Sequence, residues 1–209
     1  VERLHQQGAE LGLTFLHDPK GRFEANVRKL GEQTNATLIA ECDVASDESI
    51  EALIMQVDEQ WGELDFLVHS LAYADTQDLS KPFSETLRDG FNKAIEISTY
   101  SLLPLAKGVI PMMRKRGGGS IVSMSFIGST LAVPNYNVMG PVKAALESCT
   151  RYLARELGPE NIRINSLSPG AIRTLSSAGI KDISEMIRVA GKKNQLNRTP
   201  QKPLEIKHK

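Results

Sequence analysis

The sequence has little cysteine, no excess of either charge and no long apolar run, and each shortage excludes a class of protein. Cys42 and Cys149 lie too far apart for a disulfide framework or a cysteine-rich metal site, as is typical of a reducing compartment. The 25 basic and 25 acidic residues cancel, so no overall field favours nucleic acid or an anionic membrane. No stretch approaches the roughly 20 apolar residues of a membrane span. We therefore expect a cytoplasmic protein with no metal site and no nucleic-acid or membrane partner.

Short apolar runs alternate with longer segments of helical spacing through the first 168 residues. The runs predict strands at 11–16, 37–42, 64–70, 120–125 and 163–168. The other segments predict helices at 1–7, 21–30, 46–60, 83–113 (broken near 98–104) and 136–157. Strands that alternate with helices of this length form βαβ units. The sequence therefore predicts an α/β fold, a doubly wound parallel sheet with helices on both faces.

Polar residues follow several of these strands at the point where each strand ends. Asp43, Ser70, Ser125 and the segment 168–174 all have this position. In open parallel sheets, ligands bind beyond the carboxyl ends of the strands. The spacing alone therefore predicts a cofactor crevice at this edge.

Tyr136 and Lys143 are the residues most suited to chemistry. At about 100° per residue, a helix would place two residues seven positions apart on one face. A lysine ammonium near a phenol favours the phenolate, and the pair suits proton donation or enolate stabilisation at a carbonyl beside a nicotinamide. By itself, such a pair is more often a half-buried tyrosine and a solvated lysine. The assignment therefore depends on the surrounding sequence.

Five segments supply that context, and they occur in a characteristic order. They are Cys42-Asp43-Val44, His69-Ser70, 96–101 (EISTYS), 134–140 (PNYNVMG) and 172–182 (IRTLSSAGIKD). Together they resemble the NADH-dependent enoyl-acyl carrier protein reductase family of the short-chain dehydrogenase/reductase superfamily, over nearly all of residues 2–187. In the ketoreductase branch of that superfamily the lysine follows the tyrosine by four positions, and here position 140 is Gly. The resemblance implies a Rossmann-like fold.

The resemblance also implies a reaction and partners. The protein would reduce the trans-2 double bond of an enoyl thioester carried by acyl carrier protein, in fatty-acid biosynthesis. Hydride would pass from NADH to the β-carbon while Tyr136 stabilises the enolate. Leu16 stands where a polar residue usually meets the adenosine ribose, so NADPH remains an alternative cofactor. A homotetramer is expected from the family.

The same resemblance assigns roles to individual residues. Tyr136 and Lys143 would be catalytic. The cofactor would be bound by Asp43 and Val44 beside the adenine, Ser70, Leu71 and Ala72 beside adenine and ribose, Ser125 near the nicotinamide, Lys143 at the ribose, and Ile172 and Thr174 at the carboxamide and phosphates. The acyl substrate would meet Tyr136, Phe126 and Met139, with Leu79, Pro134 and Ile180 as further candidates to line the pocket.

Four departures from the family pattern limit these expectations. Phe126 replaces a second tyrosine, and Pro141 predicts a helix kink costing about 3 kcal/mol. The glycine-rich nucleotide loop and the final strand are not found, which predicts a sheet without its first and last strands. We therefore expect an incomplete dinucleotide-binding reductase domain at 1–190 and an irregular tail at 191–209. A ketoreductase, or a cofactor-incompetent fragment that acts only through subunit contacts, remain alternatives.

Overall fold

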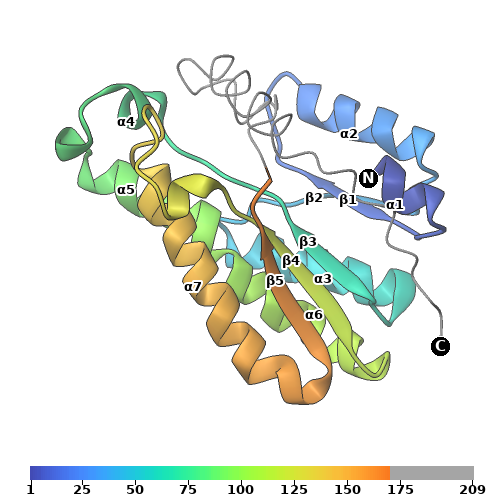
Figure 1. Ribbon diagram of the computed structural model, residues 1–209. Helices are drawn as coiled ribbons and strands as arrows, with labels where there is room; N and C mark the ends of the chain where they lie inside the picture. The colour runs from blue at the N-terminus through green and yellow to red at the C-terminus, as the bar shows by residue number, and fades with distance from the viewer. Residues whose placement is uncertain (170–209) are drawn as a thin grey trace, which may run out of the picture.

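Five parallel strands form the centre of residues 1–169, the part of the chain that the computed structural model describes (Figure 1). β1 (Gly12–Phe15) pairs with β2 (Leu38–Glu41). The second sheet has the order β3 (Phe66–His69), β4 (Gly119–Met124) and β5 (Ile162–Leu167). All five predicted strands are confirmed, with ends that differ by one or two residues. The expected single sheet is instead two sheets, and within residues 1–169 β1 and β3 each pair with one neighbour.

Helices cover both faces of the first sheet, as the α/β prediction requires. Alternate residues of a strand point to opposite faces. Ala40 of β2 joins the main hydrophobic core, whereas its neighbour Ile39 lies against Gly31 of α2 (Arg22–Gln33). Figure 1 accordingly shows α2 on one side of β1 and β2 and α3 (Asp47–Trp61) on the other.

The main core joins the two sheets through three helices. α3, α6 (Leu102–Lys115) and α7 (Met139–Leu157) contribute buried side chains such as Leu53, Met113 and Leu146, which pack with Ile121 of β4 and Ile164 of β5. Three of the shorter elements are the helix α1 (Glu2–Gln6) and the 3₁₀ turns η3 (Ile127–Ser129) and η4 (Gly158–Glu160).

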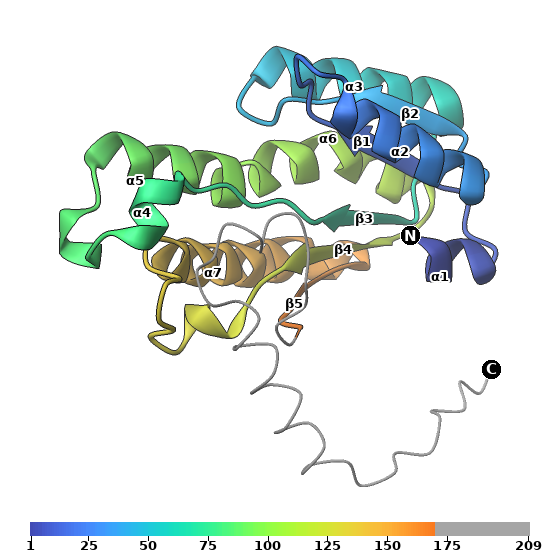
Figure 2. The same ribbon diagram turned by 90° about the horizontal axis from the view of Figure 1, so that it is seen from above.

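The predicted helix over 83–113, broken near 98–104, is confirmed from residue 88 onward, with a π-helical turn over 96–100 at the break. The structure has α4 (Thr76–Ser80), a 3₁₀ turn η1 (Phe83–Glu85), α5 (Arg88–Ile95), a π-helical turn η2 (Glu96–Tyr100) and then α6. Figure 2 shows α5 and α6 almost in line. Pro104 causes no break because it is the third residue of α6, where a backbone N–H has no partner in the helix.

A second apolar cluster lies at the start of α7. Leu79 of α4 and Ala94 of α5 pack there against Tyr136, Met139 and Val142. This cluster fixes the segment before α7, which carries the tyrosine of the candidate site. None of the helices within residues 1–169 is long and apolar enough to cross a bilayer.

Candidate functional site

Tyr136 lies in a series of turns before α7, and not on the helix. Asn135 and Asn137 on either side of it have positive φ angles of 62° and 37°. A left-handed residue cannot continue an α-helix, so α7 begins only at Met139. The predicted helical face shared by Tyr136 and Lys143 is therefore wrong. The side chain of Asn137 donates to the carbonyl oxygens of Leu79 (3.0 Å) and Lys81 (2.8 Å), which ties this turn to α4.

The predicted kink at Pro141 is also wrong. Pro141 is the third residue of α7, in the first turn, where the missing N–H costs no helical hydrogen bond. The ladder begins regularly at the next residue, since the Val142 amide donates to the Val138 carbonyl at 3.3 Å. Proline is thus placed where it favours the start of the helix.

The second apolar cluster encloses the Tyr136 side chain, which is only 6% exposed. Its ring centroid lies 4.8 Å from that of Phe126, with the planes tilted by 54°. Gly128 also lies against the Tyr136 ring, and a methyl group at position 128 would overlap that ring. Burial raises the pKa of the Tyr136 phenol. This direction is opposite to the effect expected from a nearby ammonium, so the phenol is a neutral hydrogen-bond donor at neutral pH.

Lys143 is buried at the end of β4. Its Nζ donates a hydrogen bond to the Met124 carbonyl at 2.7 Å, and the residue is 4% exposed. Burial lowers the pKa of the ammonium to about 8, so the group remains a cation at neutral pH. The lysine expected from the sequence therefore lies in the interior and not in solvent.

Ser125 follows β4 and is also buried. Its hydroxyl donates to Glu147 Oε1 on α7, and the Ser129 hydroxyl donates to the same oxygen at 2.6 Å. Glu147 was not among the expected site residues. Its position four residues after Lys143 on a predicted helix is the signal that would have found it.

His69 is a second buried polar residue that the functional assignments omitted. Its Nε2 lies 2.9 Å from Ser101 Oγ, and Nδ1 has no hydrogen-bond partner within the described chain. Burial, together with the charge of Lys143, lowers the pKa of the imidazole to about 4. His69 is therefore neutral at physiological pH.

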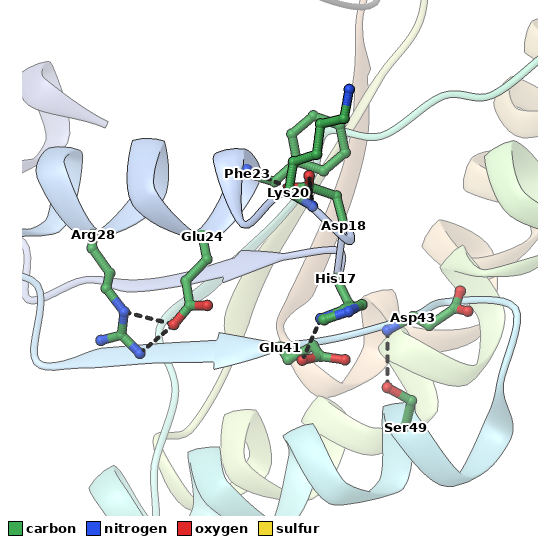
Figure 3. A network of polar contacts seen from close by, with 9 residues as sticks. All are labelled: His17, Asp18, Lys20, Phe23, Glu24, Arg28, Glu41, Asp43 and Ser49. Carbon is green, nitrogen blue, oxygen red and sulfur yellow. Dashed lines mark hydrogen bonds and ion pairs between the residues drawn. The ribbon is translucent and has the colours of Figure 1, made fainter.

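Asp43 and its neighbours form the expected cofactor edge on the first sheet (Figure 3). The Asp43 amide donates to Ser49 Oγ at 2.9 Å, and its carboxylate accepts from the Ala45 amide at 3.0 Å. These bonds stabilise the turn into α3, so a local structural role accompanies any ligand role. Val44 packs against the main core. His17 and Glu41 lie 3.7 Å apart at the same edge.

The loop after β3 approaches this edge. Ser70 is exposed, Leu71 and Ala72 are half-buried, and the Tyr73 amide donates to Ser98 Oγ at 2.8 Å. The Tyr73 hydroxyl accepts from Lys93 at 3.2 Å and raises the pKa of that lysine, with smaller contributions from the charges of Asp75 and Asp43. Lys93 of α5 therefore bonds directly to the loop after β3. Ile172, Thr174 and Ile180 lie outside the described residues.

A cavity of about 420 Å³ borders Tyr136. Its apolar walls include Phe83, Leu131, Val133 and Pro141. Met139 and Leu79, which we expected to line an acyl pocket, are buried in the second apolar cluster instead. No group of three potential metal ligands occurs in residues 1–169.

Comparison with known proteins identifies what the chain resembles. A family model described as enoyl-(acyl carrier protein) reductase matches residues 1–208. The enoyl-[acyl-carrier-protein] reductase [NADH] FabI of Synechocystis is 46% identical over 199 residues, which are 95% of this chain and 76% of that protein.

Solved structures agree with the sequence relatives. The enoyl-[acyl-carrier-protein] reductase (NADH) of Aquifex aeolicus superposes with a TM-score of 0.83 at 39% identity, over 88% of this chain and 70% of that one. The Bacillus cereus enoyl-acyl carrier protein reductase, solved with NADP+ and indole naphthyridinone, gives a TM-score of 0.84 at 37% identity, over 90% of this chain and 72% of that one. The Rossmann-like fold expected from the sequence is confirmed.

Proposed function

Because the chain belongs to the enoyl-(acyl carrier protein) reductase family, we propose that it reduces the trans-2 double bond of an acyl thioester on acyl carrier protein, in fatty-acid biosynthesis. NADH is the proposed cofactor, since the Synechocystis and Aquifex relatives carry it in their names. NADPH is the alternative, because Leu16 offers no acidic group to a ribose. The observation that carries the proposal is that Tyr136 is a neutral buried phenol, and that Lys143, seven residues later, is a buried ammonium bonded to the Met124 carbonyl at the end of β4.

The burial of Tyr136 suits it to stabilise an enolate. NADH, when bound, supplies a hydride to the β-carbon of the enoyl thioester. Negative charge then develops on the thioester oxygen, and a donor already in place stabilises it most strongly where water is excluded. Tyr136, neutral and only 6% exposed, is such a donor. The α-carbon then takes up a proton to give the saturated thioester.

Lys143 and the strand ends are proposed to hold the cofactor. An ammonium has three donors, and the bond to the Met124 carbonyl fixes it at the carboxyl end of β4, where ribose hydroxyls would lie. Ser125 marks the nicotinamide end of the same edge. Asp43, Val44, Ser70, Leu71 and Ala72 are proposed to surround the adenosine. Met139 and Phe126 would act on the substrate side through the position they give to Tyr136.

The proposal is tested by NADH oxidation in the presence of crotonyl thioester, followed by nicotinamide absorbance. We expect turnover by the wild-type chain, and a kcat lower by about 10²-fold or more for Tyr136→Phe. Tyr152→Phe is the matched control, because Tyr152 is an exposed tyrosine of α7. A folded wild-type sample without turnover would contradict the function. Turnover of a 3-oxoacyl thioester in its place would favour a ketoreductase.

We also propose that the protein acts as a homo-oligomer in the cytoplasm, with the tetramer of the family as the specific expectation. Exposed apolar side chains lie on η2, α6 and α7: Tyr100 is 50% exposed, Leu103 36% and Tyr152 76%. Contiguous patches of exposed apolar groups mark subunit interfaces, and we propose that these side chains contribute to one. The free thiols of Cys42 and Cys149 suit a reducing compartment.

A further inference from the structure

A carboxylate that takes no part in the proposed chemistry lies one helical turn after Lys143. Glu147 follows Lys143 by four residues on α7, a spacing at which opposite charges often pair. In the structure both side chains form hydrogen bonds with the segment that runs from the end of β4 to residue 129. Lys143 Nζ donates to the Met124 carbonyl at 2.7 Å, and Glu147 Oε1 accepts from the hydroxyls of Ser125 and Ser129.

These bonds fix the backbone between residues 124 and 129. Hydroxyl bonds to a carboxylate are stronger than those between neutral groups, and Ser125 is buried, which limits competition from water. Both hydroxyls reach the same oxygen, so the ends of a short loop meet at one atom of α7. The loop must therefore keep one position relative to the helix.

The residues between the two serines form the wall behind Tyr136. The centroids of the Phe126 and Tyr136 rings lie 4.8 Å apart. Gly128 lies against the Tyr136 ring with no room for a methyl group. The Gly128 carbonyl also approaches Gly140 at the start of α7. A shift of this loop would therefore move the phenol.

We infer that Glu147 is a positioning residue for Tyr136, which acts through Ser125 and Ser129 and does not touch the substrate. The inference rests on the proposed reductase function. It predicts that loss of the Glu147 acceptor lowers kcat much more than it weakens NADH binding, because Ser125 is the one proposed cofactor residue that bonds to Glu147 in the described chain.

Three variants test this role. Glu147→Ala removes the acceptor, and a displacement of the phenol by about 1 Å is expected to lower kcat by roughly 10- to 100-fold, with KM for NADH changed less than about twofold. Glu147→Gln keeps a carbonyl oxygen for both hydroxyls and should recover most of the lost kcat. Glu156→Ala, an exposed glutamate on the same helix, is the control. A Glu147→Ala enzyme with unchanged kcat overturns the inference, as does a Gln variant that is as impaired as Ala.

A double-mutant cycle separates this route from a general loss of stability. Ser129→Ala should lower kcat severalfold in the wild-type background and have no further effect in Glu147→Ala, because its partner is already gone. Multiplicative losses in the double variant would show that the two residues act independently, and would overturn the inference.

A spectroscopic readout keeps the inference testable apart from activity. In full-length protein labelled with fluorotyrosine, the resonance lost in Tyr136→Phe reports the surroundings of the phenol. It should shift in Glu147→Ala and stay in place in Glu156→Ala. An absence of wild-type turnover would remove the proposed function, whereas an unshifted resonance in Glu147→Ala would remove the positioning role.

Discussion

Gly128 shows how a single missing side chain shapes the candidate site. Its Cα lies against the Tyr136 ring, so any side chain at this position competes with the phenol for the same space. Because Tyr136 is enclosed by its apolar cluster, the ring cannot move without cost.

Gly128→Ala is therefore expected to displace the Tyr136 phenol. We predict a kcat lower by about tenfold or more, by analogy with small misplacements of catalytic groups. Gly117→Ala is an informative comparison, because a methyl group there meets open space, although its φ of 80° strains the backbone. Equal kcat values for Gly128→Ala and wild type would contradict this view of the site.

His69 predicts a dependence of stability on pH. The folded-state pKa is about 4, below the ordinary 6.5, so between these values the unfolded chain binds a proton that the folded chain does not. The contribution of the neutral imidazole to the free energy of unfolding is complete above pH 6.5. It decreases as the pH is lowered toward 4, by an amount on the order of 3 kcal/mol. Denaturant titrations of His69→Gln should show a flatter profile across this window.

The exposed His17 provides the control for that measurement. His17→Gln should keep the steep profile of the wild-type chain. If His69→Gln and wild type lose stability in parallel below pH 6.5, the buried imidazole is not the source of the pH dependence.

At this scale, the sequence singles out Tyr136 and Lys143 but does not predict their surroundings. Tyr136 and Lys143 are recognisable because a motif of several neighbours specifies them. The role of Glu147 depends on a loop that returns from β4, and a non-local contact of this kind leaves no periodic signal in the chain. The positive φ angles at Asn135 and Asn137 delay the start of α7 to Met139, and the bond from Asn137 to Leu79 of α4 in this turn is likewise non-local.

The first turn of α7 contains a proline, Pro141, which the sequence alone predicts to be destabilising. In the structure Pro141 belongs to the first turn, where its ring restricts the unfolded chain and removes no helical bond. We therefore predict that Pro141→Ala lowers the free energy of unfolding by less than about 1 kcal/mol. A gain of about 3 kcal/mol, measured by chemical denaturation, would instead indicate an interior kink.

Strands were easier to predict than helices in this chain. Each strand is a short apolar run between turn residues, and its short length and flanking turns distinguish it from a helix. The segment from 83 to 113 has helical spacing, yet it contains three kinds of helical turn: 3₁₀, α and π. The spacing of apolar residues alone does not distinguish an α-turn from the π-turn at Glu96–Tyr100. The π-turn is stabilised by the buried Ser98 and by the bond from Thr99 to the Val142 carbonyl (2.9 Å).

On the scale of the whole molecule, the alternation of strands and helices was sufficient to predict the fold class. It could not predict that the strands form two sheets, because pairing between strands is decided by contacts across the sheet. The main core nevertheless unites both sheets through α3, α6 and α7.

The exposed face of α7 leads to a prediction about assembly. Tyr152→Glu places a charge on a surface that we propose to be buried between subunits, so sedimentation should show a smaller species than the wild-type oligomer. Arg151→Glu, an exposed change beside it, controls for charge alone. A wild-type chain that sediments as a monomer would contradict the proposed assembly.

The π-turn has one further consequence for how this chain tolerates change in length. A π-turn closes with a bond five residues apart, here from the Ser101 amide to the Glu96 carbonyl at 3.1 Å, and so contains one residue more than an α-turn. Deleting one residue from 96–100 would let α5 and α6 fuse into one regular helix with little rotation of α5, because the π-turn already absorbs the extra residue. The deletion would instead disturb the bonds that the turn makes, from the Tyr73 amide to Ser98 and from Thr99 to the Val142 carbonyl, so an apparently idealising change would loosen the start of α7.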